Sequence, residues 1–335
     1  MANFWQMLRP HLGNDYSFLY PVQVKNILMK LLVLFYTLCR FVWRMLFGSY
    51  DLVLLNPSLG RTAVKRDMIY AFLAKRVFRK KLMIFWHGWN LNYEKTIDAQ
   101  MIARFHQTLF KADKMFVLAS TFEKTLRKWG YSNPVQRICT CYSDTCPAEK
   151  GETTPERPIQ LLFLSRVEIA KGIMELLDAF KILLQRYGES AVELTVAGDG
   201  NALNDVKKYV EDHAITNVKF TGYVRGKDKD EVLRDSDIFI LPSYGEGMPC
   251  ALLEAMGAGD AVITSKVGGI PDFFEEEKMG YMLESVTAEE IAGAIGKFLN
   301  RPELIRQTGR YNRAYAVQNF TAQKVVENLQ YHLGN

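Results

Sequence analysis

The sequence has few cysteines, and their spacing matches neither a disulfide framework nor a zinc site. Five cysteines occur among 335 residues, an odd number at irregular intervals, which argues against the paired cysteines of small secreted domains. Cys139, Cys141 and Cys146 cluster, but no second cluster follows at zinc-binding spacing. We therefore predict reduced thiols in a cytoplasmic protein.

The sequence also lacks a recognisable signal peptide and a long uninterrupted apolar run. Residues 1–15 show no charged start followed by an apolar stretch. Residues 22–47 are apolar, but cations divide them, and the longest uncharged stretch, Leu31–Cys39, is too short to span a bilayer. A helix lying in a membrane interface and a helix packing its apolar face on a sheet both fit this segment. The cations share one arc of a helical wheel: Lys25, Lys30, Arg40 and Arg44.

Charge is divided unevenly along the chain. Residues 1–150 contain 22 Lys and Arg against 9 Asp and Glu, a net charge of +13, whereas residues 151–335 contain 20 against 28, a net charge of −8. The basic half would attract an anionic membrane surface, a phosphorylated acceptor or nucleic acid; an unevenly charged solvated surface is the alternative. We expect no nucleic acid, because no aromatic and basic motif lies on a recognisable nucleic-acid fold.

After about residue 50, short apolar runs alternate with longer segments of 3.6-residue period, which is typical of a parallel α/β sheet. Residues 147–158 break this pattern with three prolines, one glycine and five charges, and they predict a linker. We therefore predict two doubly wound, Rossmann-like domains. The predicted strands are 50–55, 82–86, 114–119 and 135–141, then 159–165, 192–197, 218–222, 237–241 and 261–264.

The strongest motif is SYGEGMPCALLEAM at residues 243–256, directly after a predicted strand. Gly245 and Gly247 allow a tight turn from strand to helix. Pro249 suits the first turn of a helix predicted at Met248–Met256. The free N–H groups and the positive dipole at such a helix start favour an anion.

Charged side chains in two loops suit a nucleotide sugar. Glu246 and Glu254 lie eight residues apart, and a carboxylate can accept hydrogen bonds from both hydroxyls of a ribose or sugar diol. The second motif, SRVEIAKG at residues 165–172, follows another predicted strand. Its Arg166 and Lys171 can neutralise a diphosphate, the arginine as a planar fork and the lysine as a point charge. Such groups stabilise the charge that develops on a leaving nucleoside diphosphate.

The second half resembles the donor domain of family 4 glycosyltransferases, which are retaining enzymes with the GT-B fold, two Rossmann-like domains facing a cleft. The resemblance implies a hexosyltransferase of EC class 2.4 that moves a sugar from a nucleoside-diphosphate sugar to a glycan or lipid-linked acceptor. It implies bacterial envelope polysaccharide synthesis, no metal and no cofactor. It covers about residues 159–285 and rests on SRVEIAKG, GDG at 198–200, TGYV at 221–224, the Glu246 and Glu254 pair, and GGIPD at 268–272.

The resemblance also implies roles for single residues. Arg166 and Lys171 bind the donor diphosphate, Glu254 holds the ribose, and Glu246 contacts the transferred sugar. His87, after the predicted strand 82–86, matches the family's cleft histidine, so we expect His87 and Glu246 to be catalytic. Further donor-binding residues are expected at Gly198, Gly247, Met248, Gly268 and Gly269, with Val267 beside the last two.

Two positions depart from the family pattern without touching the pair of glutamates. Asp260 stands where the family usually has proline, and Asp272 stands where it often has glutamate. Asp235-Ser236-Asp237 fits a DxD metal motif, but it directly precedes a predicted buried strand, so we interpret it as capping or turning the chain.

The resemblance sets the expected domain limits. Residues 1–146 form the acceptor-side domain, 147–158 the linker, 159–310 the donor domain, and 311–335 a helix that returns toward the first domain, with a bend expected at Phe320. Enzymes of this type open with a strand and a glycine-rich loop, whereas residues 2–12 read as the first helix and 15–20 as the next strand. We therefore expect the first strand to be missing.

Other classes of function stay open at this stage. A non-catalytic or impaired nucleotide-sugar-binding subunit fits the unusual start, and a GT-B nucleotide-sugar epimerase fits the general fold. The expected location is cytoplasmic, with peripheral contact between the basic half and an anionic membrane.

Overall fold

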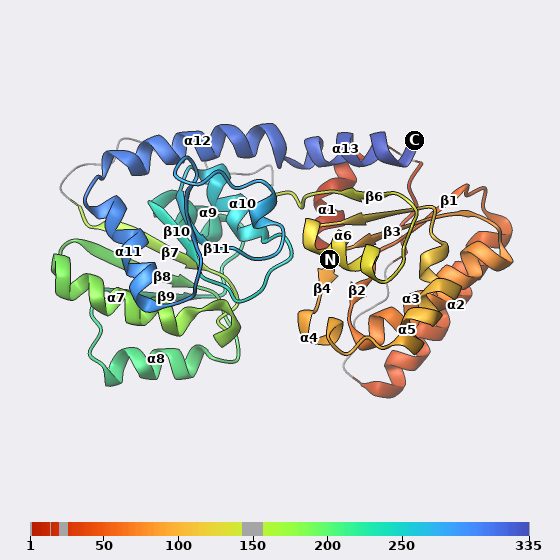
Figure 1. The fold of residues 1–335 in the computed structure, drawn as a ribbon, viewed down its shortest axis with the longest axis horizontal. Coiled ribbons are helices and arrows are strands. Elements are labelled where there is room, and N and C mark those ends of the chain that lie inside the picture. The colour runs from red at the N-terminus through yellow and green to blue at the C-terminus, as the bar shows by residue number, and fades with distance from the viewer. Residues whose placement is uncertain (1, 14, 20–25, 143–156, 335) are drawn as a thin grey trace. The chain divides into compact units, whose positions relative to one another are not determined.

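The computed structural model describes residues 2–13, 15–19, 26–142 and 157–334 (Figure 1). Two structural units divide the chain: unit 1 comprises residues 1–139 and 326–335, and unit 2 comprises residues 140–325. Each unit has its own parallel sheet. Among the described residues, no helix has the length and hydropathy needed to cross a membrane.

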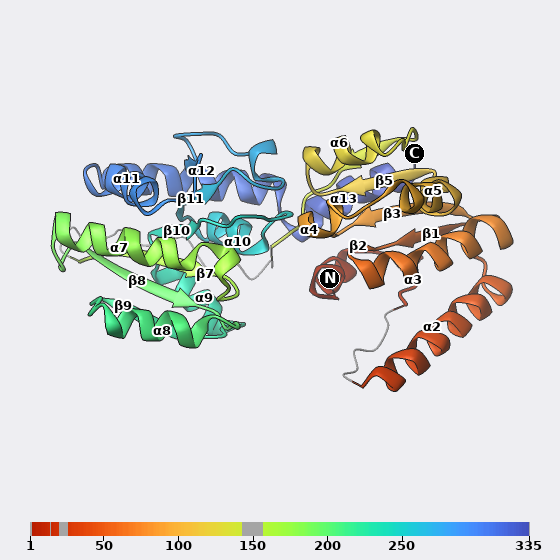
Figure 2. The ribbon, with the colours of Figure 1, turned by 60° about the horizontal axis from the view of Figure 1, so that its bottom comes forward.

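Unit 1 is built on a four-stranded parallel sheet in the order β1-β3-β5-β6. Side chains 82–86 are buried along β3, as expected for an interior strand of a parallel sheet covered on both faces. Figure 2 shows α3 against this sheet and α2 farther out, beyond α3. The strands are β1 (Leu52–Leu55), β3 (Lys81–Trp86), β5 (Lys114–Val117) and β6 (Val135–Arg137), with a separate short pair, β2 (Ser58–Leu59) and β4 (Gly88–Trp89).

The helices of unit 1 are shorter than the periodicity predicts. The periodicity predicts a helix at 62–78, which is an α-helix only to Phe72 and continues as a π-helical turn. It predicts another at 95–111, which is divided into two pieces, Ala99–Gln107 and a 3-10 turn at Leu109–Lys111. The helices are α1 (Ala2–Leu8), α2 (Ile27–Phe47), α3 (Arg61–Phe72), the π-helix Leu73–Val77, α4 (Leu91–Glu94), α5 (Ala99–Gln107) and α6 (Ser120–Lys128), with 3-10 turns at Arg9–His11 and Leu109–Lys111.

The beginning of the chain is helical as predicted, but the strand predicted next is wrong. Residues 15–19 form no strand, and residue 20 lies outside the described residues. Arg44 Nη1 donates a hydrogen bond to the carbonyl of Phe18 at 2.9 Å, so this backbone group is satisfied by a side chain instead of a neighbouring strand. Strand β1 forms one edge of the sheet.

Unit 2 is built on a six-stranded parallel sheet in the order β12-β11-β10-β7-β8-β9. The strand order reverses between β7 and β10, which makes this point the topological switch of a doubly wound sheet. Strands β7 to β11 agree with the sequence prediction, whereas β12 was not predicted. The strands are β7 (Ile159–Leu164), β8 (Val192–Ala197), β9 (Val218–Gly222), β10 (Ile238–Leu241), β11 (Ala261–Ser265) and β12 (Gly280–Leu283).

The helices of unit 2 follow the predicted pattern with one addition, α9, and one interruption. The helix predicted at 302–333 is two helices separated at Phe320 and Thr321, where the bend was expected. The Phe320 carbonyl accepts a hydrogen bond from the backbone N–H of Tyr142 at that break. The helices are α7 (Ile173–Tyr187), α8 (Leu203–Asp212), α9 (Lys227–Asp235), α10 (Cys250–Ala258), α11 (Ala288–Leu299) and α12 (Glu303–Asn319), with 3-10 turns at Ile169–Lys171 and Ile270–Asp272. Helix α13 (Ala322–Gly334) begins in unit 2, and its residues from 326 onward belong to unit 1.

The predicted linker lies mostly outside the described residues, of which it includes only Arg157 and Pro158. Residues 326–335 group with unit 1, and Lys114 Nζ of that unit donates a hydrogen bond to the carbonyl of His332 at 2.6 Å. Among the described residues, Cys39, Cys139, Cys141 and Cys250 form no disulfide bond, and Cys146 lies outside these residues.

Candidate active site

The predicted donor residues of unit 2 follow strands that end at one edge of its sheet. All six strands are parallel, so their carboxyl ends lie at the same edge. The loop at 165–172 follows β7, and the loop at 242–249 follows β10, on the two sides of the switch point. Ligands of doubly wound sheets bind outside the carboxyl ends at such a point.

These two loops contact each other directly. Lys171 Nζ donates a hydrogen bond to Glu246 Oε1 at 2.6 Å, and the two side chains are only 12% and 11% exposed. Ser243 Oγ donates to the same carboxylate oxygen at 2.7 Å. The backbone N–H of Tyr244 donates to the carbonyl of Ala170 at 3.0 Å. The structure thus brings one residue from each of the two strongest motifs into a largely buried ion pair.

A third loop packs against the glutamate loop and depends on glycine. Gly268 has φ +61°, and a Cβ there would overlap the backbone oxygens of Glu246 and Gly247. Gly269 N–H donates a hydrogen bond to the Gly247 carbonyl at 2.7 Å. The predicted donor residues Gly247, Gly268 and Gly269 therefore lie together around Glu246.

The loop after β8 makes an equally close approach to the arginine loop. Gly198 has φ +154°, and a Cβ there would overlap the carbonyl of Ser165. The backbone N–H of Val167 donates to the carbonyl of Asp199 at 3.1 Å. Gly198 thus lies against Ser165, the residue before Arg166, through backbone contacts that leave no space for a side chain.

Arg166 is the most solvent-accessible of the predicted donor residues with charge. Its side chain is 69% exposed, and its Nη1 donates a hydrogen bond to Glu168 Oε1 at 2.6 Å. In the described part of the chain, no hydrogen bond or ion pair joins Arg166 to Lys171 or Glu246. An exposed guanidinium at the carboxyl edge of β7 retains freedom to turn toward an anionic ligand.

The helix after the glutamate loop begins two residues later than predicted. Helix α10 starts at Cys250, and Pro249 precedes it with extended backbone angles of φ −74° and ψ 114°. No side chain caps this end, so the helix start keeps free backbone N–H groups for an anion. Met248 lies in the connecting turn, where its carbonyl accepts a hydrogen bond from Thr140 Oγ1 at 3.3 Å.

Glu254 has a lysine partner that the sequence did not reveal. Lys229 Nζ donates a hydrogen bond to Glu254 Oε1 at 2.7 Å, and the side chains are 24% and 14% exposed. Lys229 lies on α9, within the charge-rich segment KDKDEV, which has the composition of a solvated surface. Both predicted glutamates are therefore held by lysines from other elements, Glu246 by Lys171 and Glu254 by Lys229.

His87 belongs to unit 1, where aromatic rings enclose it. Its ring centroid lies 4.0 Å from that of Phe85, 4.6 Å from Phe4 and 5.9 Å from Trp5. Nε2 is buried and has no hydrogen-bond partner within the part of the chain that the structure describes. Burial lowers the pKa of His87 to about 3, so the imidazole is neutral at pH 7. Its catalytic role stays a prediction.

The DxD-like segment makes structural contacts. Asp237 accepts hydrogen bonds from the guanidinium of Arg157 at 2.8 Å and from the backbone N–H of Gln160 at 2.8 Å. Ser236 Oγ lies 3.0 Å from both carboxylate oxygens of buried Asp260. No group of three or more potential ligands able to hold a metal ion occurs among the described residues.

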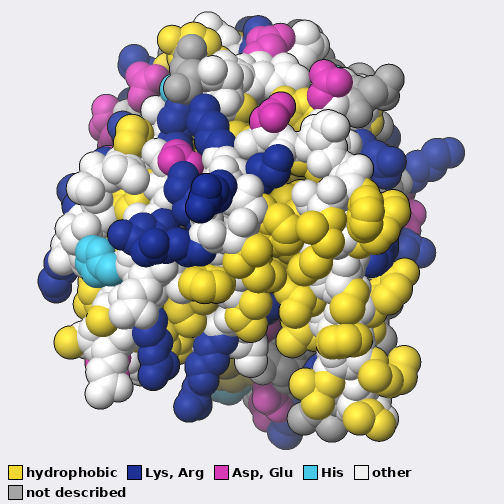
Figure 3. Space-filling model, turned by 90° about the vertical axis from the view of Figure 1, so that its right-hand side faces the viewer, with side chains coloured by type: hydrophobic (Ala, Val, Ile, Leu, Met, Phe, Trp, Pro, Cys, Tyr) yellow, Lys and Arg dark blue, Asp and Glu magenta, His cyan; other side chains and the backbone are white. Residues whose placement is uncertain are grey.

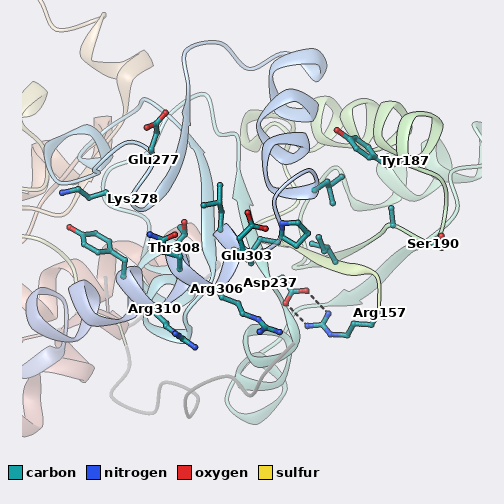
Figure 4. Close-up of a pocket in the computed structure, with 18 residues that line it drawn as sticks. Arg157, Tyr187, Ser190, Asp237, Glu277, Lys278, Glu303, Arg306, Thr308 and Arg310 are labelled. Carbon is teal, nitrogen blue, oxygen red and sulfur yellow. Dashed lines mark hydrogen bonds and ion pairs between the residues drawn. The ribbon is translucent and has the colours of Figure 1, made fainter. Parts of the chain in front are cut away.

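An open pocket of about 1470 Å³ lies at the opposite edge of the same sheet (Figure 4). Ile159, the first residue of β7, and Asp237, which directly precedes β10, line it. The figure shows Arg157 pointing toward Asp237. The predicted donor residues follow the carboxyl ends of the strands, so this pocket is separate from the candidate donor site.

Comparisons with known proteins agree with the motifs. Residues 147–315 match the family model described as glycosyl transferases group 1, which is half of the chain. The uncharacterized glycosyltransferase MJ1069 of Methanocaldococcus jannaschii is 26% identical over 304 residues, covering 85% of this chain and 76% of its own length. The amylovoran biosynthesis glycosyltransferase AmsK of Erwinia amylovora is 30% identical over 173 residues, covering 45% of this chain and 42% of its own length.

A solved structure shares the fold. Anabaena HepE, in complex with UDP and glucose, superposes with a TM-score of 0.68 at 16% identity, covering 94% of this chain and 84% of that one. This likeness and the two parallel sheets establish the predicted GT-B fold with two Rossmann-like domains.

Proposed function

This chain belongs to the group 1 glycosyltransferases, transferases of EC class 2.4, and on that premise we propose that it uses a nucleoside-diphosphate sugar and retains the anomeric configuration. The observation that carries the donor proposal is the junction of Lys171 and Glu246 at the switch point of the unit 2 sheet. HepE, which shares the fold, has been solved with UDP and glucose.

Each part of the donor has a matching group in the proposal. Arg166, Lys171 and the free N–H groups at the start of α10 counter the diphosphate charge without a metal ion. Glu254, held by Lys229, accepts hydrogen bonds from the ribose hydroxyls. Glu246 contacts the transferred sugar, and the backbone of Val267–Gly269 lines the pyrophosphate and sugar pocket.

The reaction needs one bond broken and one formed at the anomeric carbon. The bond from this carbon to the diphosphate oxygen breaks, and the acceptor hydroxyl oxygen bonds to the carbon on the same face. The acceptor proton passes to the departing diphosphate, giving a nucleoside diphosphate and a glycoside. The cations stabilise the negative charge that develops on the leaving group. In this proposal the imidazole of His87 contacts the donor sugar. Because it is neutral, it does not help to stabilise the charge on the leaving diphosphate.

The proposed acceptor is a growing glycan or lipid-linked glycan of the cell envelope, at the cytoplasmic face of a membrane. The match to AmsK, an amylovoran biosynthesis enzyme, supports polysaccharide synthesis. The net charge of +13 in residues 1–150 supports an anionic surface or a pyrophosphate-linked acceptor.

The test is a transfer assay followed by NMR. The purified chain is incubated with UDP-, GDP-, ADP- and TDP-sugars and with lipid-linked acceptors, with and without EDTA. We expect one donor class to give a product with the anomeric configuration of the donor, at a rate that EDTA does not change. Glu246→Gln should lower the rate at least about a hundredfold, in the range of lost transition-state contacts, whereas Glu211→Gln, the same change at an exposed position of α8, serves as the matched control.

Four outcomes would contradict the proposal. An inverted product would exclude the retaining reaction, and loss of activity in EDTA would exclude metal independence. Conversion of the nucleotide sugar without an acceptor would identify an epimerase, and donor binding without any turnover would identify a binding subunit.

A further inference from the structure

Helix α2 of unit 1 is apolar on two opposite sides, and only one of them is packed. Phe41 is buried, and its ring centroid lies 5.1 Å from that of Tyr70 in α3 and 6.4 Å from that of Phe78. Thr37, one turn earlier, is buried as well. These contacts are with α3 and Phe78 and not with the sheet that the packing alternative named, and they involve only the inner side.

The outer face of α2 presents large apolar side chains to solvent. Phe35 is 67% exposed, Trp43 62% and Phe47 73%. A surface helix of a soluble protein normally carries polar residues on the side away from its core. The outer face comprises Leu28, Leu32, Phe35, Tyr36, Trp43, Leu46 and Phe47, all of them exposed.

The apolar area extends beyond α2 and has a basic border. Ile69 and Phe72 of α3 and Val77 of the following π-helical turn are also exposed. Figure 3 shows hydrophobic side chains gathered on this side of the molecule, with lysine and arginine side chains beside them. A contiguous exposed apolar patch with a charged rim marks an interaction surface.

The charges on α2 itself have one sign. Helix α2 contains Lys30, Arg40 and Arg44 and no acidic residue. Exposed Arg76 and Arg79 follow α3. Within the described part of the chain, Lys30, Arg40, Arg76 and Arg79 form no ion pair, although Arg40 lies over the ring of Tyr36 at 5.7 Å. These cations remain available to an external anion.

We propose that the outer face of α2 is a membrane-docking surface that inserts its aromatic and aliphatic side chains into the interface of an anionic bilayer. An amphipathic helix of this kind lies in the headgroup plane with its apolar face buried and its cations at the lipid phosphates. Aromatic side chains are favoured at that depth. A second copy of the chain would bring an identical set of cations against this one, which like-charge repulsion disfavours.

Vesicle binding tests the proposal on the full chain. We expect the protein to sediment with vesicles of 70% phosphatidylcholine and 30% phosphatidylglycerol and to bind pure phosphatidylcholine vesicles much more weakly. Lys30→Glu/Arg40→Glu should lower partitioning into the anionic vesicles by about tenfold or more, because each cation near such a surface contributes measurably to binding. Phe35→Ser/Phe47→Ser should lower partitioning into both kinds of vesicle.

Matched substitutions elsewhere on the chain test whether the loss of vesicle binding is specific to this surface or follows from any loss of positive charge or exposed apolar area. The variant Lys124→Glu/Lys128→Glu on α6, at another side of unit 1 in Figure 2, changes the net charge by the same amount as Lys30→Glu/Arg40→Glu. Tyr223→Ser in unit 2 removes a ring that is 72% exposed. Both should bind vesicles within about twofold of the unaltered chain. The emission of Trp43 should shift to the blue and be quenched by brominated lipid, with Trp43→Phe as the blank.

Several results would overturn the proposal. One is failure of the unaltered chain to bind anionic vesicles, and another is unchanged binding by the Phe35→Ser/Phe47→Ser variant. A dimer in sedimentation velocity that this variant dissociates, without vesicle binding, would show that a second copy covers the face. The inference deepens the membrane contact of the proposed function, but vesicle binding and sugar transfer are measured separately, so either can fail while the other stands.

Discussion

Lys171 and Glu246 form a 2.6 Å ion pair although 75 residues separate them in the chain. Each follows a strand next to the switch point of the unit 2 sheet, and each side chain is almost enclosed. The pair therefore links the loop proposed for the diphosphate with the loop proposed for the sugar. The same lysine can exchange this partner for a phosphate, because both are oxyanions.

The first prediction concerns the energy of this pair. A double-mutant cycle of Lys171→Met and Glu246→Gln, followed by urea unfolding, should give a coupling energy of about 1–2 kcal/mol, typical of partly buried charged contacts. The exposed pair Lys208 and Asp212, also 2.6 Å apart, is the control; its cycle should show no measurable coupling. Equal values for both cycles would show that burial of the first pair has no energetic consequence.

The second prediction concerns Lys229 as a positioning residue. If Lys229 orients Glu254 for the ribose, Lys229→Met should reduce the preference for a nucleoside diphosphate over its 2′,3′-dideoxy form by about fivefold to tenfold, the range of one lost hydrogen bond. Lys229→Arg should retain most of the preference. Calorimetric titration with both ligands measures it. A uniform loss of affinity for the two ligands would assign Lys229 a general electrostatic role instead.

Except for β12, the strands of both sheets could be predicted, because most of them are continuous apolar runs. β8 and β9 have the predicted bounds, and β7 differs by one residue. That the loops at 165–172 and 242–249 lie at the same edge of the sheet was also predictable, since both follow parallel strands. The partner of Glu254 was not, because Lys229 lies in a charged segment, and only the placement of α9 beside α10 brings it to the carboxylate.

The chain before β1 was harder to predict. Residues 15–20 were predicted as the strand that follows the first helix, but the Phe18 carbonyl accepts a hydrogen bond from Arg44 of α2, and the described residues 15–19 join neither sheet. The pattern of α2 could not decide between packing and membrane contact, since the helix has apolar residues on both sides. The structure shows Phe41 inside and Phe35 outside.

The third prediction concerns acid stability. The pKa of His87 falls from about 6.5 in the unfolded chain to about 3 in the folded one, so the unfolded state binds the extra proton between these values. The free energy of unfolding should therefore decrease as the pH falls from 6.5 toward 3. Between pH 7 and pH 4, the free energy of unfolding of His87→Gln should fall by about 1–3 kcal/mol less than that of the unaltered chain. This range is set low to allow for partial access of solvent to the imidazole.

Urea unfolding at several pH values measures this effect, and exposed His213→Gln serves as the control. An identical pH dependence for the unaltered chain and His87→Gln would show that the folded protein leaves His87 free to ionise.

The fourth prediction concerns a buried amide in unit 2. Asn312 is fully buried, and its Nδ2 donates to the carbonyls of Asp260 at 2.7 Å and Met279 at 2.8 Å. Asn312→Ala should lower the free energy of unfolding by about 2–4 kcal/mol, because it leaves both carbonyls without this donor. Gln307→Ala, exposed on the same helix, should change it by less than about 0.5 kcal/mol. A loss below 1 kcal/mol for Asn312→Ala would contradict this account.

Calorimetric titration with UDP, GDP, ADP and TDP tests the donor site most directly. The unaltered chain and an Arg166→Ala/Glu254→Ala variant are compared, with Lys208→Met as a surface control and circular dichroism as the check of folding. We predict that one nucleotide binds the unaltered chain and the control, and that the double variant binds it at least about a hundredfold more weakly, from two lost charged contacts. Equal binding by a folded double variant would contradict the placement of the donor at the carboxyl edge of β7 and β10.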